Sequence, residues 1–142
     1  MAERVPSDHD SVTSFRASVA RSGGTRRPCL RLPDDAAVAE GDVVRLLLDG
    51  TTTFARVSAD SRGLLVRGAY DNERLAREPR EGENRLVEWC ERHDRGPDDA
   101  VELDELDPGY CYGLREPGDR VVYDVPARPN ESLRDIASSF RD

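Results

Sequence analysis

Alternating apolar and polar residues predict a β-hairpin early in the chain. From Phe15 to Val19 every second side chain is apolar, which is the period of a half-buried strand. Gly23-Gly24 predicts a reversal, because glycine tolerates positive φ. Residues 28–32 return with the same alternation, and Pro28 belongs at a strand edge or a bulge because it has no amide hydrogen.

A nearly continuous apolar run at residues 43–49 predicts a strand buried on both faces. A single helical turn over residues 36–40 is expected before it. Asp49-Gly50 is a strong hairpin signal, so residues 51–58 are predicted as the partner strand. Residues 63–70 are predicted as the next strand.

The middle of the chain has a helical period. Residues 72–77 predict a short helix, and residues 83–93 predict an amphipathic helix closed by Gly96-Pro97. Further strands are predicted at residues 100–106, 110–115 and 120–125. A C-terminal amphipathic helix over residues 130–141 is expected to lay Leu133, Ile136 and Phe140 on the body of the protein.

These elements predict an α+β, β-rich fold: a pseudobarrel of about seven to eight mostly antiparallel strands with a middle helix and a C-terminal helix. Residues 1–12 are polar and aperiodic and are predicted to be a flexible tail. Residues 13–142 are predicted to form a single domain. Residues 13–70 and 82–125 share an order of acidic turn, apolar strand, tight turn and aromatic strand, which suggests two similar halves.

The charge composition changes how the surface is interpreted. All 21 basic residues are arginine, against 29 acidic residues, for a net charge of −8. Acidic surfaces stay hydrated in strong salt, and high net charge is a feature of halophiles. We therefore expect a salt-adapted source, such as a haloarchaeon. The acidity then reflects the solvent and is a weaker argument against an anionic partner.

The sequence predicts neither a membrane protein nor a disulfide-bonded protein. No stretch has the length of a membrane span, and the N-terminus lacks the apolar core of a signal peptide. Cys29, Cys90 and Cys111 are widely spaced and odd in number, so they predict buried, reduced thiols. A cytoplasmic protein without a membrane partner is expected.

One stretch departs from the general acidity. Between Ser11 and Pro33 there is no acidic residue, but there are five arginines: Arg16, Arg21, Arg26, Arg27 and Arg31. Arginine side chains and the backbone amides of turns are the usual phosphate contacts. Two interpretations stay open: these arginines bind an anion such as nucleic acid, or they pair with carboxylates elsewhere on the surface.

Other candidate sites have simpler explanations. Cys90 and His93 lie one helical turn apart and could form half a zinc site, but a packed thiol and a surface histidine are favoured. The acids within residues 98–107 lack the spacing of a calcium loop and indicate a solvated strand face.

The aromatic residues also allow two interpretations. The tyrosines could stack on bases, although strand aromatics are more often core or cross-strand partners; they are Tyr110, Tyr112 and Tyr123. Trp89 is expected in the core or at a subunit contact. No nucleophile elbow, P-loop or dinucleotide fingerprint is present, so no enzyme, cofactor or metal is predicted.

The first half resembles the AbrB/SpoVT transcription-regulator fold over about a quarter of the chain. The matching positions are Gly24-Thr25, Leu30, Leu32-Pro33, Val38, Gly41-Asp42 and Val44. The resemblance implies a β-rich pseudobarrel that binds DNA through Arg21, Arg26 and Arg27, flanked by Arg16 and Arg31. That family usually completes its barrel as a dimer, so a homodimer is one arrangement to test. Pro28 departs from the pattern, and the further residues of this chain allow an internally completed barrel. The chain is also generally similar to uncharacterised haloarchaeal proteins, which implies nothing about activity.

The function predicted from the sequence is a non-enzymatic regulator that binds nucleic acid, DNA before RNA. The alternative is a protein-interaction or assembly module in which the same arginines meet an acidic protein partner.

Overall fold

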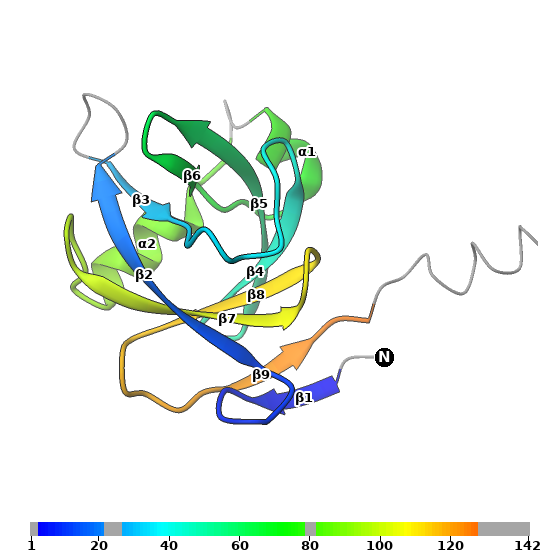
Figure 1. The fold of residues 1–142 in the computed structure, drawn as a ribbon. Helices are drawn as coiled ribbons and strands as arrows, with labels where there is room; N and C mark the ends of the chain where they lie inside the picture. The colour runs from blue at the N-terminus through cyan, green and yellow to red at the C-terminus, as the bar shows by residue number, and fades with distance from the viewer. Residues whose placement is uncertain (1–2, 22–26, 79–81, 128–142) are drawn as a thin grey trace, which may run out of the picture.

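Seven strands close into a barrel in the order β2-β3-β6-β5-β4-β8-β7 (Figure 1). The computed structural model describes residues 3–21, 27–78 and 82–127. The barrel strands are β2 (Thr13–Arg21), β3 (Pro28–Arg31), β4 (Val43–Leu48), β5 (Thr51–Asp60), β6 (Gly63–Val66), β7 (Ala100–Asp107) and β8 (Cys111–Arg115). The predicted β-rich barrel is confirmed, and it closes within one chain.

The barrel is mixed, although most neighbouring strands run antiparallel. The exception is the pair β4 and β8, which run parallel with Arg45 opposite Cys111. β2 and β3 form the predicted hairpin. β2 also pairs along its length with β7, with Phe15 opposite Leu103, and this pairing of distant segments helps to close the barrel.

Inward-facing apolar side chains fill the barrel. Alternate residues such as Val19, Leu46 and Val57 belong to one buried cluster, as the two-residue period of a strand requires. The interior void is about 10 Å³ and its lining is apolar apart from Tyr112. That volume is about one water, so the barrel interior is a packed core without room for a ligand.

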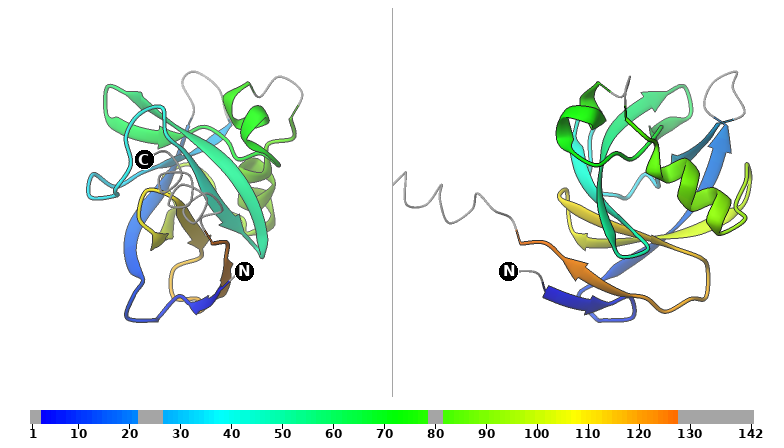
Figure 2. Two further views of the ribbon diagram at one scale, coloured as in Figure 1. Left: turned by 90° about the vertical axis from the view of Figure 1, so that its right-hand side faces the viewer. Right: turned by 180° about the vertical axis from the view of Figure 1, so that it is seen from behind.

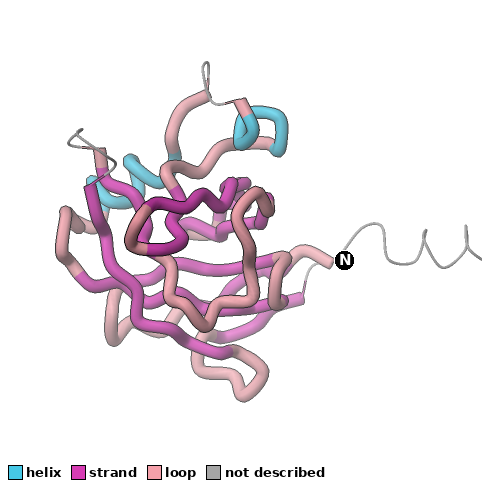
Figure 3. The backbone as a smooth tube through the Cα atoms, turned by 45° about the horizontal axis from the view of Figure 1, so that its top comes forward, coloured by secondary structure: helices cyan, strands magenta, loops and turns pink. Residues whose placement is uncertain are grey.

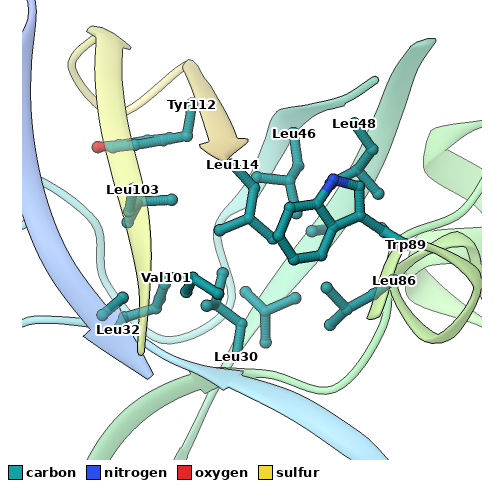
Figure 4. Close-up of a cluster of buried hydrophobic side chains, with 14 of the residues drawn as sticks. Leu30, Leu32, Leu46, Leu48, Leu86, Trp89, Val101, Leu103, Tyr112 and Leu114 are labelled. Atoms are coloured by element: carbon teal, nitrogen blue, oxygen red, sulfur yellow. The ribbon is translucent and has the colours of Figure 1, made fainter. Parts of the chain in front are cut away.

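Two short helices cover part of the barrel (Figure 3), where the sequence predicted a short helix over residues 72–77 and a longer middle helix over residues 83–93. They are α1 (Glu73–Arg77) and α2 (Arg85–Arg92). The Asn84 side chain caps α2 by accepting a hydrogen bond from the Leu86 amide. α2 lies across the barrel (Figure 2) and sends Leu86 and Trp89 into the core (Figure 4). The apolar face of the predicted helix is therefore confirmed.

Residues 3–6 form a strand within the segment 1–12 that was predicted to be a flexible tail. β1 (Glu3–Pro6) pairs antiparallel with β9 (Val122–Val125) in a separate two-stranded ribbon. A second apolar cluster joins this ribbon to the outside of the barrel through Tyr123, Leu47 and Cys111. The Tyr123 ring lies against Gly113, where any side chain would collide with it.

Three further expectations differ from the structure or lie outside it. Residues 36–40 form an irregular loop in place of a helical turn. The two proposed halves both contain a hairpin, but their last strands differ, because β6 joins the barrel and β9 does not. The predicted helix over 130–141 lies outside the described residues. No helix in the described part of the chain is long and apolar enough to span a membrane.

Candidate functional site

The β2–β3 hairpin carries the described members of the predicted arginine cluster. Arg16 lies on the outer face of β2, between inward-facing neighbours, and Arg21 is the last residue of that strand. Arg27 directly precedes β3, and Arg31 ends it. Arg16, Arg21 and Arg27 are exposed. Arg26 lies outside the described residues.

Strand register gathers two of these arginines at one end of the hairpin. Arg21 lies opposite Pro28, so it is a neighbour of Arg27. Arg16 lies further along β2, beyond Ser18, which pairs with Arg31. The hairpin therefore carries exposed arginine near both of its ends, although Arg21 has the strand parity of the inward-facing Val19 and not that of Arg16.

Arg31 forms an ion pair within the protein. Its two terminal nitrogens each donate to Asp60 at 2.8 Å, which links β3 to β5 across β6. The hydrogen bond from Arg31 lowers the pKa of Asp60. The prediction that all five arginines form a free binding surface is therefore wrong for Arg31, which is an ion-paired residue.

Arg67 is a further arginine of this face that the sequence did not reveal. It follows Val66, the last residue of β6, which pairs with Leu30 of β3. Arg67 is therefore next to Cys29. Burial raises the pKa of the Cys29 thiol, and the charges of Arg31 and Arg67 partly oppose that rise. No local signal marks Arg67, because only the β3–β6 pairing brings it here. We call Arg16, Arg21, Arg27, Arg31 and Arg67 the arginine face.

Three members of the arginine face make no ion pair with a described residue, although Glu102 lies opposite Arg16 in the β2–β7 pair. Within residues 3–21, 27–78 and 82–127, the side chains of Arg16, Arg21 and Arg67 make no ion pair. Neither β2 nor β3 contains an acidic residue. The guanidinium groups of Arg16, Arg21 and Arg67 are exposed to solvent, so their N–H donors are available to an external anion.

A groove crosses the arginine face between β7, β2 and β3. Its volume is about 480 Å³, within the range of small-ligand sites. Polar groups come from Arg16, Ser18, Arg31 and Asp98, and apolar surface comes from residues such as Pro33 and Ala100. The groove can hold an anionic group at one side and a hydrogen-bond donor at the other.

Further along the β2–β7 pair, beyond Arg16, lies a buried charge cluster around Asp104. Its carboxylate is fully buried and accepts hydrogen bonds from Arg115 at 2.8 Å, Tyr123 at 2.6 Å and Ser14 at 2.6 Å. Burial, followed by the hydrogen bond to Asp104, raises the pKa of Tyr123. The expectation of a solvated strand face is therefore wrong at Asp104, because β9 covers it.

Cys90 and His93 do not share a site. Cys90 belongs to the core, whereas the ring of His93 stacks on Trp89 and is held by two carboxylates. Nδ1 lies 2.7 Å from Glu116, and Nε2 lies 2.9 Å from Asp49. Burial alone would lower the pKa of His93, but these hydrogen bonds raise it above its ordinary value.

The chemistry available to the described thiols is limited. All three cysteines are free and buried, as predicted. Burial raises the pKa of Cys90 to about 11 and that of Cys111 to about 12. At neutral pH both are thiols and poor nucleophiles, since the thiolate is the reactive form. The arginine face therefore offers better chemistry for binding than these groups offer for catalysis.

Comparison with known proteins assigns a family but no activity. No curated protein and no solved structure gives a significant match. The AbrB/SpoVT resemblance stays a prediction, because none of these comparisons shows it. A family model described as a family of unknown function matches residues 1–140, and the chain therefore belongs to that family, DUF7112.

Proposed function

We propose that this protein is a non-enzymatic, cytoplasmic regulator that binds nucleic acid through the arginine face. The observation that carries this proposal is that Arg16, Arg21 and Arg67 make no ion pair within the described residues. Leu30 of β3 is one of the positions that resemble the AbrB/SpoVT regulators, and that resemblance favours DNA before RNA as the partner.

Local charge explains how an acidic protein could attract phosphate here. The net charge of −8 repels a polyanion as a whole, but binding depends on the field at the contact surface. On the arginine face the cations come from three adjacent strands of the barrel, β2, β3 and β6. Each exposed guanidinium can donate two parallel hydrogen bonds to a phosphate.

High salt sets a condition on this mode of binding. Counterion release drives much of the affinity for nucleic acid, and it weakens as salt rises. A salt-adapted protein must therefore depend more on directed hydrogen bonds. Arginine meets this requirement better than lysine, because its planar group matches the geometry of phosphate.

The test is a binding titration with a triple variant. Labelled DNA and RNA, duplex and single-stranded, are titrated with the full chain at several KCl concentrations, and fluorescence anisotropy gives the Kd. Replacing Arg16, Arg21 and Arg67 by serine should weaken binding to every sequence. The slope of log K against log salt should become shallower by about 0.9 for each duplex phosphate that the variant no longer neutralises.

A charge-matched variant provides the control. Arg56, Arg74 and Arg77 are exposed and make no ion pair with described residues, but they lie on β5 and α1. Replacing these three by serine should change binding much less. Equal reductions in affinity for the two triple variants would mean that only net charge matters. If the wild type binds no nucleic acid and retains an acidic protein, the interaction-module alternative replaces this proposal.

A further inference from the structure

The groove on the arginine face has two chemically different ends. Arg16 lies opposite Glu102 on β7, and Ser18 lies opposite Ala100, so the chain towards Asp98 continues away from Arg16. β7 begins at Ala100, and Asp98 lies in the turn before it. Arg16 therefore lies near one end of the groove and Asp98 near the other, with Arg31 opposite Ser18 between them.

Asp98 is held at its end of the groove by the backbone. Its amide donates to the Val19 carbonyl at 2.8 Å, and the Val19 amide donates to the Asp99 carbonyl at 2.9 Å. The φ of Asp98 is 75°, a conformation that aspartate adopts more readily than most residues. The Asp98 carboxylate makes no hydrogen bond or ion pair within the described residues, so its oxygens are available to a ligand.

The shape of the site favours an unpaired nucleotide. Duplex grooves are read by elements that protrude from a protein, such as helices and ribbons. A hollow of about 480 Å³ instead suits a base that is splayed out of a single strand. Pro33 and Ala100 provide apolar surface against which the base can lie.

We propose that this groove binds one guanine nucleotide of a single strand, with phosphate on Arg16 and the base edge on Asp98. The inference rests on the proposed nucleic-acid-binding function. A carboxylate only accepts hydrogen bonds. Guanine offers two adjacent donors, N1–H and the 2-amino group, whereas adenine and cytosine each place an acceptor beside their amino group. Thymine and uracil present carbonyl oxygens on both sides of one N–H. Guanine is therefore the base that matches Asp98 best.

The test uses single strands that differ at one position. Labelled oligothymidylate with a central guanine, cytosine, adenine or thymine is titrated with the full chain. The guanine strand should bind about tenfold more tightly than the thymine strand. Asp98→Asn should remove this preference, because an amide presents a donor as well as an acceptor. Arg16→Ser should weaken the binding of all four strands alike.

Asp94→Asn is the matched control. Asp94 is also an exposed aspartate with positive φ, 52°, and lies outside the groove lining. The Asp94→Asn substitution should leave the preference for guanine unchanged. If Asp98→Asn changes all four affinities equally, or duplex binds more tightly than every single strand, the guanine site is overturned while the proposed function stands. If the wild type binds no strand at any salt, both fail.

Discussion

Arg16 and Arg115 flank the same residue of β7, yet their surroundings are opposite. Glu102 lies opposite Arg16 on one side and opposite Arg115 on the other. The Arg115 side chain is 12% exposed and bound to the fully buried Asp104. Arg16 is exposed and has no ion pair among the described residues. The β1–β9 ribbon makes the difference, because Tyr123 of that ribbon covers the Asp104 side.

The comparison shows that burial beneath a neighbouring segment determines the role of a charged residue. Beneath the ribbon, water is excluded, so Asp104 and Arg115 must satisfy each other with help from Tyr123 and Ser14. On the arginine face, water solvates the exposed guanidinium of Arg16, and an anion can replace that water. The same residue type therefore stabilises the fold on one side of β7 and is available for binding on the other.

The largest effect on stability is expected for a substitution that disrupts the ion pair of Asp104 and Arg115 beneath the ribbon. Asp104→Asn removes the charge that partners Arg115, which leaves a buried cation uncompensated. The free energy of unfolding, measured by urea titration, should fall by about 3–5 kcal/mol. A decrease below about 1 kcal/mol would contradict the buried cluster. Glu102→Gln, at the preceding outward-facing position of β7, is the control and should change stability little.

An intermediate effect is expected at His93, which joins α2 to Glu116 after β8. Its pKa is higher in the folded protein than the usual value of about 6.5. The imidazolium therefore stabilises the fold fully below about pH 6.5, and this contribution disappears as the pH rises through the folded-state pKa. Urea titrations of the wild type and His93→Gln should differ by about 1 kcal/mol at acidic pH and converge at higher pH. A constant difference would show that His93 contributes through packing alone.

The smallest effect on stability is expected for a substitution on the arginine face. Arg16→Ser removes a solvated side chain and should change the free energy of unfolding by less than about 0.5 kcal/mol. Binding of nucleic acid should nevertheless weaken, as measured by anisotropy. If Arg16→Ser were as destabilising as Arg115→Ser, Arg16 would be a structural residue, and the contrast between the two faces would be wrong.

Local pattern was sufficient for several elements. The alternation beginning at Phe15 predicted the β2–β3 hairpin, and the apolar run of β4 correctly indicated burial on both faces, with Leu46 inside the barrel and Leu47 beneath the ribbon. The amphipathic pattern around Trp89 predicted α2. These signals succeed because periodicity in the chain directly sets which side chains share a face.

The candidate site was only partly predictable. The run of arginines identified Arg16 and Arg21, but it could not show that Arg31 is bound by Asp60. Arg67 and Asp98 were missed, because β6 and the segment before β7 reach this face only through strand pairing. Nothing in a single sequence specifies which distant strands will be neighbours.

By itself, the amino-acid sequence determined the barrel strands, the amphipathic helix and a local excess of arginine over acid. Only the tertiary structure decided which charges are covered and which face water. The physical reason is that periodicity and composition are properties of the local sequence. The free-energy cost of an unpaired charge depends instead on whether other segments of the fold exclude water from around it. Asp104 and Arg16, both polar strand residues in the sequence, differ for that reason alone.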